Sequence, residues 1–239
     1  MAMLGSAPRR FYKNVAVIQT EVGWGVTLDG KVLRSPARNA LDLPSRALAD
    51  AIAGEWDAQI EKIQPHSMPL MQVAATAVDR IGPARASIVA DLAGYAGTDL
   101  ICYRATEPAT LVERESQTWD PLLDWLRRRY DVSLSVTSGI VTIPQPQASL
   151  DALARAVDGF GDFALAALAT LVYAAGSLVI ALAVAEGELT AEQAAHAAQL
   201  DELYQAERWG EDKEALERRV GQLAELVAAR RFLDLLGQP

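Results

Sequence analysis

The side chains best able to do chemistry in this sequence lie in one acidic segment, LDELYQAERWG, at residues 200–210. Two carboxylates can serve as general acid and general base when both face the same substrate. Asp201 and Glu202 are adjacent, however, so on a helix their side chains point about 100° apart. Three roles stay open for Asp201, Glu202 and Glu207: pairing inside the fold, binding a partner, or acid–base catalysis.

Helical spacing divides the side chains around this segment between two faces. One face carries His196, Leu200, Leu203 and Glu207, and the other carries Ala194, Ala198, Asp201 and Gln205. The second face continues an alanine stripe that we expect to pack closely against another helix. A carboxylate at the edge of such a surface needs a partner. We therefore predict a partner-binding set made of Asp201, Glu202, Gln205, Glu207 and Trp209.

Other chemical signatures are lacking in the sequence. The single cysteine, Cys102, stands among apolar neighbours, which is typical of a small buried side chain. The two histidines, His66 and His196, are far apart in sequence and do not have the spacing of a zinc site. Phosphate-loop, dinucleotide, nucleophile-elbow and metalloprotease motifs do not occur. We predict no catalytic residue, no metal and no organic cofactor.

The charge is concentrated in the second part of the chain. Residues 85–239 hold 23 acidic and 13 basic side chains, whereas residues 1–84 hold 8 and 9. Residues 186–217 contain ten acids against Arg208 and Lys213, a net charge of −8. Such a segment cannot neutralise phosphates, so nucleic acid is not an expected partner. It is either a solvated helix face or a docking surface for a basic protein.

The first forty residues predict a small antiparallel sheet. Strands are expected around residues 15–17, 24–28, 31–33 and 39–43, and Asp29-Gly30 is the dipeptide that a type I′ hairpin turn requires. Pro44 and Ser45 then begin a helix. Its apolar residues recur every four positions, at Leu48, Ile52, Trp56 and Ile60. We expect this face to pack on the sheet, with Trp24 and Trp56 as structural residues.

The remainder of the chain predicts mostly helices. A helix over residues 70–80 should stop at Gly82-Pro83, and we place a domain boundary there. Asp120-Pro121 has the pattern of an N-cap followed by proline at the first helical position. Apolar residues alternate with polar ones over residues 132–143, which predicts a short hairpin or an irregular strand pair. Thr190 and Gln193 have capping-box spacing.

Phe163–Ala185 is an uncharged stretch of 23 residues, long enough to cross a bilayer. Its many alanines, its acidic flanks and the lack of a positive-inside signature favour a single helix buried inside a helical domain. We therefore expect no membrane insertion. The last helix, over residues 213–236, repeats Leu216, Val220, Leu223 and Val227 on one face.

Together these patterns predict an α+β N-terminal domain with a small antiparallel sheet, residues 1–84. A larger, mainly α-helical domain, residues 85–239, follows and is built around residues 163–185. The N-terminus has no apolar segment of the signal-peptide kind.

Seven stretches, in order along the chain, resemble the ATP12 family, the assembly chaperones of the F1 sector of ATP synthase. They are FYKNVAV, GWGVTLDGKVLRSPARNALDLPS, EWDAQ, IQPHSMPL, YAGTDLICYRA, WDPLLDW and LDELYQAERWG. The resemblance implies a non-enzymatic chaperone that binds the unassembled F1 α subunit before it joins β. It also implies a small α/β domain followed by a helical one, which agrees with the patterns above.

The resemblance places a functionally sensitive acidic position of the family at Asp201, where this chain has Asp in place of the usual Glu. It makes Trp56 the anchor of the N-terminal core. Because the chain reaches FYKN almost at once, we expect a bacterial cytoplasmic protein without a transit peptide. We also expect a monomer. The alternatives are a helical interaction module for another basic partner, or an acid–base enzyme using Asp201, Glu202 and Glu207.

Overall fold

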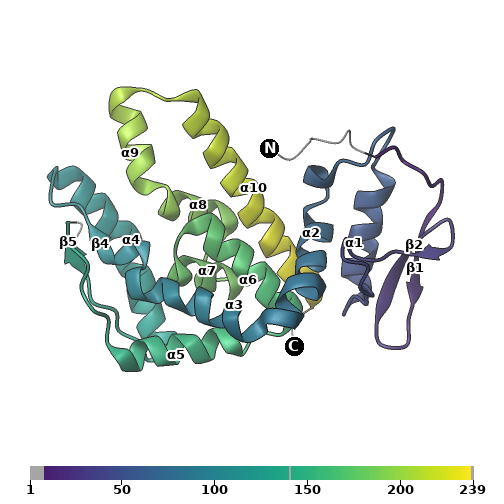
Figure 1. Ribbon diagram of the computed structural model, residues 1–239. Coiled ribbons are helices and arrows are strands. Elements are labelled where there is room, and N and C mark those ends of the chain that lie inside the picture. The colour runs from purple at the N-terminus through teal and green to yellow at the C-terminus, as the bar shows by residue number, and fades with distance from the viewer. Residues whose placement is uncertain (1–7, 140, 238–239) are drawn as a thin grey trace.

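The computed structural model describes residues 8–139 and 141–237, and the elements run from an N-terminal sheet into a long series of helices (Figure 1). The strands are β1 Val15–Gln19, β2 Trp24–Leu28, β3 Lys31–Val32, β4 Tyr103–Arg104 and β5 Thr137–Ser138. The α-helices are α1 Arg46–Asp57, α2 Pro69–Thr76, α3 Gly82–Gly94, α4 Ala109–Tyr130, α5 Gln147–Asp158, α6 Asp162–Ala175, α7 Leu178–Ala185, α8 Ala191–Ala198, α9 Leu200–Trp209 and α10 Lys213–Leu236. Short 3-10 turns at Pro65–Ser67, Tyr95–Thr98 and Leu100–Cys102 and a π turn at Ala77–Ile81 complete the series.

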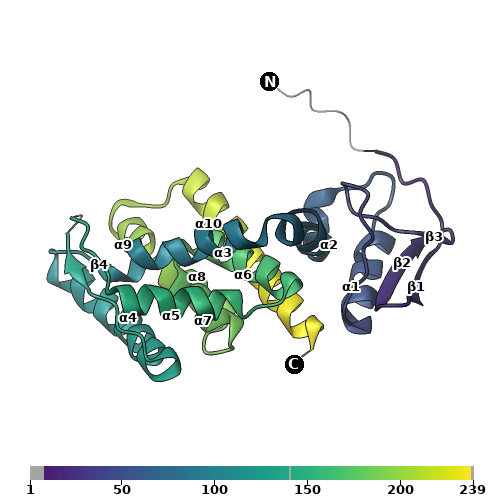
Figure 2. The ribbon, with the colours of Figure 1, turned by 60° about the horizontal axis from the view of Figure 1, so that its bottom comes forward.

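The N-terminal sheet is antiparallel in the order β1-β2-β3, and α1 covers it (Figure 2). The predicted turn is confirmed, since Asp29 and Gly30 both have positive φ, 48° and 80°. The Asp29 carboxylate accepts hydrogen bonds from the backbone N–H groups of Lys13 and Asn14. The prediction of a fourth strand at residues 39–43 is wrong, because this segment makes only isolated β-bridges to Arg34 and Trp24.

Helix α1 begins as predicted, with the Ser45 hydroxyl accepting from the N–H of Leu48 at 3.1 Å. Its core face ends at Trp56, which is 9% exposed and packs edge-on against Tyr12 with ring centroids 5.7 Å apart. The inclusion of Ile60 in that face is wrong. The helix ends at Asp57, so Ile60 lies beyond it and is 84% exposed.

The helical run does not stop at Gly82-Pro83 as predicted. The π turn joins α2 to α3, and the backbone kinks at Ala84, where φ is −128°. Proline is tolerated at this place because it lies in the first turn of α3. The division into domains at residue 84 stays a prediction.

The N-cap predicted at Asp120 is also wrong, because Asp120 and Pro121 lie inside α4, which runs unbroken for 22 residues. Asp120 instead accepts a hydrogen bond from the guanidinium of Arg104 at 2.9 Å. The hairpin predicted within residues 132–143 is wrong as well. Thr137–Ser138 pairs in parallel with Tyr103–Arg104, and Ile140, part of that prediction, lies outside the described residues.

The uncharged stretch 163–185 is largely buried, although Tyr173 is 53% exposed, and it forms two helices in place of the single helix predicted. Gly176 ends α6 in the left-handed conformation with φ +65°, and the Ser177 hydroxyl caps α7 by accepting from the N–H of Ile180. The buried Asp99 carboxylate accepts in turn from the Ser177 hydroxyl at 2.6 Å and from the N–H of Val179 at 3.1 Å. No helix among the described residues is long and apolar enough to span a bilayer.

Helix α10 contacts both the helical region and the N-terminal part of the chain. It packs on α6 and α8, and its C-terminal end also reaches α2 and α1, where the Ser45 hydroxyl donates to the carbonyl of Leu235. One continuous core therefore runs from the sheet through α6 and α7 to α10. The predicted fold class, a small antiparallel sheet followed by a mainly helical region, is confirmed.

Candidate functional site

The acidic segment forms its own helix, α9, separated from α8 by a break at Gln199. The single helix implied by the sequence is therefore two. The capping box that starts α8 is confirmed, with Thr190 and Gln193 exchanging side chain–backbone hydrogen bonds of 2.9 and 3.2 Å. Helices α9 and α10 stand out from the rest of the helical region as a two-helix arm (Figure 1). The arm is defined here as residues 200–227.

One face of α9 meets the first half of α4. The carboxylate of Glu207 accepts two hydrogen bonds from the guanidinium of Arg114, at 2.8 and 3.0 Å. The guanidinium carbons of Arg114 and Arg208 lie 5.2 and 4.5 Å from the centre of the Tyr204 ring. The hydroxyls of Tyr204 and Thr110 are 2.6 Å apart. Glu207 is thus held by an ion pair inside the fold.

This face borders an open hollow of about 520 Å³ between α4 and α9. Its lining residues are Arg114, Gln117, Thr118, His196, Leu200, Leu203 and Glu207. The prediction that His196, Leu200, Leu203 and Glu207 share one face is therefore confirmed.

Glu202 points toward α10. Its carboxylate accepts from the Arg218 guanidinium at 2.9 Å and lies 4.0 Å from Arg219. Arg219 is only 6% exposed and also pairs with Glu211. The charge of Glu202 is thereby balanced within the arm.

Asp201 occupies a different environment. It is half-buried, and its Oδ1 atom is buried without a hydrogen-bond partner among the described residues. Its neighbour is Glu115 of α4, which is 1% exposed and accepts from the N–H of Ala105 at 2.9 and 3.1 Å. Burial raises the pKa of Glu115, and the charge of Asp201 raises it further. Burial likewise raises the pKa of Asp201.

The charge of Arg104 acts on Glu115 and opposes the rise of its pKa, but neither carboxylate forms a salt bridge within the described residues. Two such neighbouring carboxyl groups can share a proton or accept a cation from outside. The sequence prediction missed Glu115. It lies four residues before Trp119, on the face of α4 that also buries Leu122 and Leu126. A carboxylate in register with an apolar stripe is the signal that could have found it.

The remaining predicted site residues, Gln205 and Trp209, are exposed, with Trp209 77% exposed. The three carboxylates of the catalytic alternative do not meet at one cavity within the described part of the chain. Asp201 faces Glu115, Glu202 faces Arg218, and Glu207 faces Arg114.

The other residues considered for chemistry lie apart from α9. Cys102 is fully buried, and burial raises the pKa of its thiol to about 12. His66 is exposed in the 3-10 turn before α2. Trp24 is half-buried, with the Arg46 guanidinium carbon 5.4 Å from the centre of its ring. The described residues contain no group of three His, Cys, Asp or Glu side chains arranged to hold a metal ion.

Known proteins of one family match this chain in sequence and in structure. A family model described as ATP12 chaperone protein matches residues 9–127. The crystal structure of Atp12 from Paracoccus denitrificans superposes with a TM-score of 0.92 and 40% identity, covering 96% of this chain and 98% of that one. This chain belongs to the ATP12 chaperone family.

Further relatives agree with the ATP12 assignment. The Atu1473 protein of Agrobacterium tumefaciens has a TM-score of 0.92 and 43% identity, over 96% of this chain and 86% of its own. The mitochondrial protein atp12 of Schizosaccharomyces pombe is 27% identical over 224 residues, which are 87% of this chain and 76% of that protein. The family model ends within α4 at residue 127 and includes Glu115, whereas the Paracoccus match extends over 96% of this chain.

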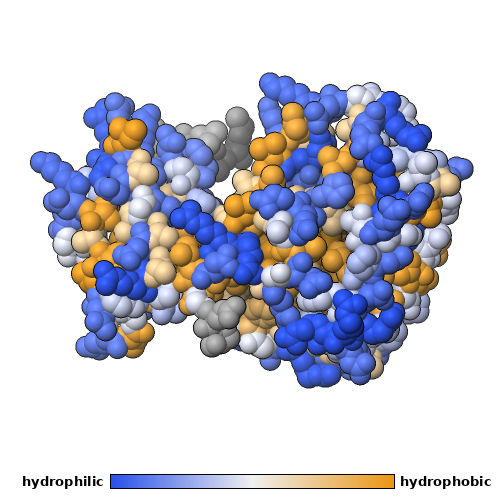
Figure 3. Space-filling view, turned by 180° about the vertical axis from the view of Figure 1, so that it is seen from behind, coloured by the Kyte–Doolittle hydropathy of each residue, from blue (hydrophilic) through white to orange (hydrophobic). Residues whose placement is uncertain are grey.

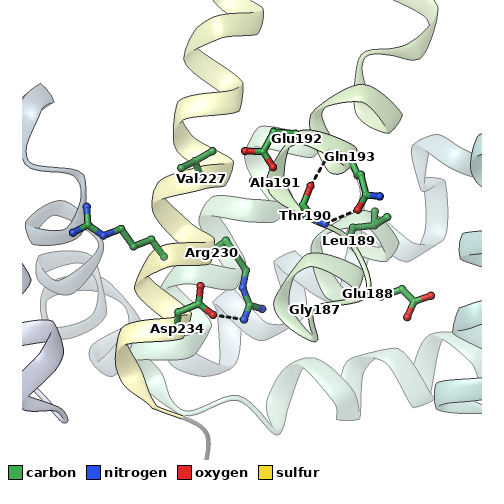
Figure 4. A pocket seen from close by; sticks show the side chains of 11 residues that line it. Gly187, Glu188, Leu189, Thr190, Ala191, Glu192, Gln193, Val227, Arg230 and Asp234 are labelled. Carbon is green, nitrogen blue, oxygen red and sulfur yellow. Dashed lines mark hydrogen bonds and ion pairs between the residues drawn. The ribbon is translucent and has the colours of Figure 1, made fainter.

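A second hollow of this ATP12-family chain, about 460 Å³, lies between the α7–α8 turn and α10 (Figure 4). Of its two arginines, Arg230 and Arg231, the first is already engaged. Arg230 donates to the carbonyls of Val184 and Ala185 at 2.8 and 3.0 Å and pairs with Asp234. These bonds satisfy the end of α7, so the contacts around Arg230 hold α10 against the core.

Proposed function

We propose that this chain is a chaperone for assembly of the F1 sector of ATP synthase, that it acts without catalysis, and that it binds the unassembled α subunit. Membership of the ATP12 chaperone family supports the class of function. The choice of the α subunit rests on the resemblance of the seven sequence stretches. The observation that carries the site is the carboxyl pair of half-buried Asp201 and buried Glu115, which forms no salt bridge within the described residues. Arg104, whose charge acts on Glu115, forms its salt bridge with Asp120.

The chemistry of this pair specifies what the partner supplies. A buried acceptor atom without a donor costs free energy in the unbound protein, and a lysine or arginine from the partner removes that cost. Glu202 and Glu207 already have arginines within the fold, so Asp201 is the carboxylate best placed to accept a new cation. Gln205 and Trp209 are exposed on the same helix and contribute contacts around it.

The test compares two charge reversals of equal size in an aggregation assay. Unassembled α subunit is diluted from denaturant, and light scattering is followed with each variant present. Asp201→Lys puts an ammonium next to Glu115, in the position that the cation of the partner would take. Binding should therefore weaken by about 2–5 kcal/mol, the loss typical of a buried charge pair. Asp151→Lys, on the exposed side of α5, makes the same change in net charge and should protect like the unmutated protein.

Thermal unfolding separates loss of the site from loss of the fold. The ammonium that Asp201→Lys introduces can pair with Glu115, so that variant should melt close to the unmutated protein. If Asp201→Lys melts normally and still protects the α subunit, the site assignment is wrong. If the unmutated protein gives no protection, the chaperone proposal itself fails.

A further inference from the structure

The face of α10 on which the sequence repeats apolar residues is largely exposed. Leu216, Val220 and Val227 are 40%, 59% and 41% exposed, and Leu223 between them is half-buried. These four residues are called the apolar stripe below. Helix α10 instead turns other residues toward the core, chiefly Leu226, Ala229 and Phe232.

Spacings of four, three and four residues place the apolar stripe on one side of the helix. A helix face of this kind is normally buried, so an exposed one marks a surface that another molecule covers. Figure 3 shows hydrophobic side chains along the course of α10, beside the hollow that separates the arm from the N-terminal part. Trp209, 77% exposed, stands at the end of the arm where α9 turns into α10.

The charges around the stripe indicate the chemistry of that molecule. Residues 200–227 hold eight acidic side chains against Arg208, Lys213, Arg218 and Arg219, a net charge of −4. Glu214 and Glu225 are exposed and make no ion pair within the described residues. An apolar stripe within an acidic surface complements a segment that is apolar at its centre and cationic at its edges.

We propose that the apolar stripe, together with Trp209, docks an amphipathic segment of the unassembled partner that carries apolar side chains flanked by Lys or Arg. This inference rests on the proposed function and adds the surface by which the partner's apolar interface is covered. The stripe lies on the second helix of the arm and Asp201 on the first, and Trp209 at the end of the first helix belongs to both surfaces.

The experiment measures the Kd of the full chain for the α subunit with two double variants. Leu216→Gln/Val220→Gln replaces two exposed stripe residues by good helix formers, so the helix is kept. Val22→Gln/Ile60→Gln is the matched control, because these residues are also apolar, 78% and 84% exposed, and lie in the N-terminal part. Circular dichroism and thermal melts verify that both variants fold.

We expect the stripe variant to bind at least about tenfold more weakly and the control variant within twofold of the unmutated protein. Adding Glu214→Lys and Glu225→Lys to the stripe variant should weaken its binding further at low salt. This additional loss of affinity should shrink at about 500 mM NaCl. If the unmutated chain binds and the stripe variant binds within twofold of it, the surface assignment is overturned while the proposed function stands. If the unmutated chain sediments as a dimer that the stripe variant abolishes, a second copy is the occupant and the inference is equally overturned.

Discussion

Replacing Asp99 by Asn should remove a pH-dependent loss of stability that arises at the junction of α6 and α7. Asp99 is 0% exposed, and its carboxylate accepts from the Ser177 hydroxyl and from the N–H groups of Ile101 and Val179. Burial raises the pKa of Asp99 from 3.8 to about 6, although these hydrogen bonds oppose the shift.

The size of the stability change follows from the difference between the pKa values of Asp99 in the folded and unfolded states. Between about pH 4 and 6 the unfolded chain has released the proton of Asp99 while the folded protein still holds it. The folded state then binds more protons, so stability falls as the pH rises, and the loss is complete above about pH 7. A difference of roughly 2 pKa units corresponds to about 3 kcal/mol.

The assay is urea unfolding of the unmutated protein and Asp99→Asn at half-unit steps from about pH 4 to 7.5. Because all other titrating groups are common to both proteins, their contributions cancel in the difference between the two unfolding free energies. That difference should shift by about 3 kcal/mol in favour of the variant across the range. Asp50→Asn, at an exposed position of α1, is the control for the loss of one surface carboxylate. A constant difference for Asp99→Asn would refute the reasoning.

Three further predictions concern the core, a helix cap and the thiol. Leu178→Ala, at a fully buried position of α7, should lower the unfolding free energy by about 2–5 kcal/mol in urea titrations, and a loss below about 1 kcal/mol would contradict the packing described. Thr190→Ala removes one half of the α8 capping box and should cost about 1 kcal/mol, whereas Thr118→Ala, inside α4, should cost less. Cys102, buried and with its thiol pKa raised to about 12, should resist alkylation by iodoacetamide at about pH 8 until urea unfolds the protein, and rapid native labelling would show the site to be open.

The sequence predicted best where the local chemistry decides the local structure. The Asp29-Gly30 turn, the Ser45 cap and the Thr190 capping box each depend on residues within four positions of one another. The break at Gly176-Ser177 was just as local. A glycine in the left-handed region followed by a capping serine ends one helix and starts the next, but the apolar composition on both sides concealed it.

The errors came from tertiary contacts that no periodicity reports. Asp120 has the sequence pattern of an N-cap, yet it lies inside α4. Its carboxylate pairs with Arg104 because strand β4 brings that arginine beside the helix. The apolar stripe of α10 has the spacing of a core face, and only the packing of α10 on α6 and α8 shows that other residues are buried. Asp201 was predicted as a site residue from the sequence, whereas Glu115 lies 86 positions earlier and meets Asp201 only in the fold.

The most direct test of the central claim is a titration of this chain into refolding F1 α subunit, with the mass of the product measured by sedimentation. The account predicts that aggregation stops near one chain per α subunit, that a complex of the two sediments as one species, and that Asp201→Lys forms little of it. If the α subunit aggregates at the same rate with and without the chain, and no complex sediments, the assignment as an α-subunit chaperone is contradicted.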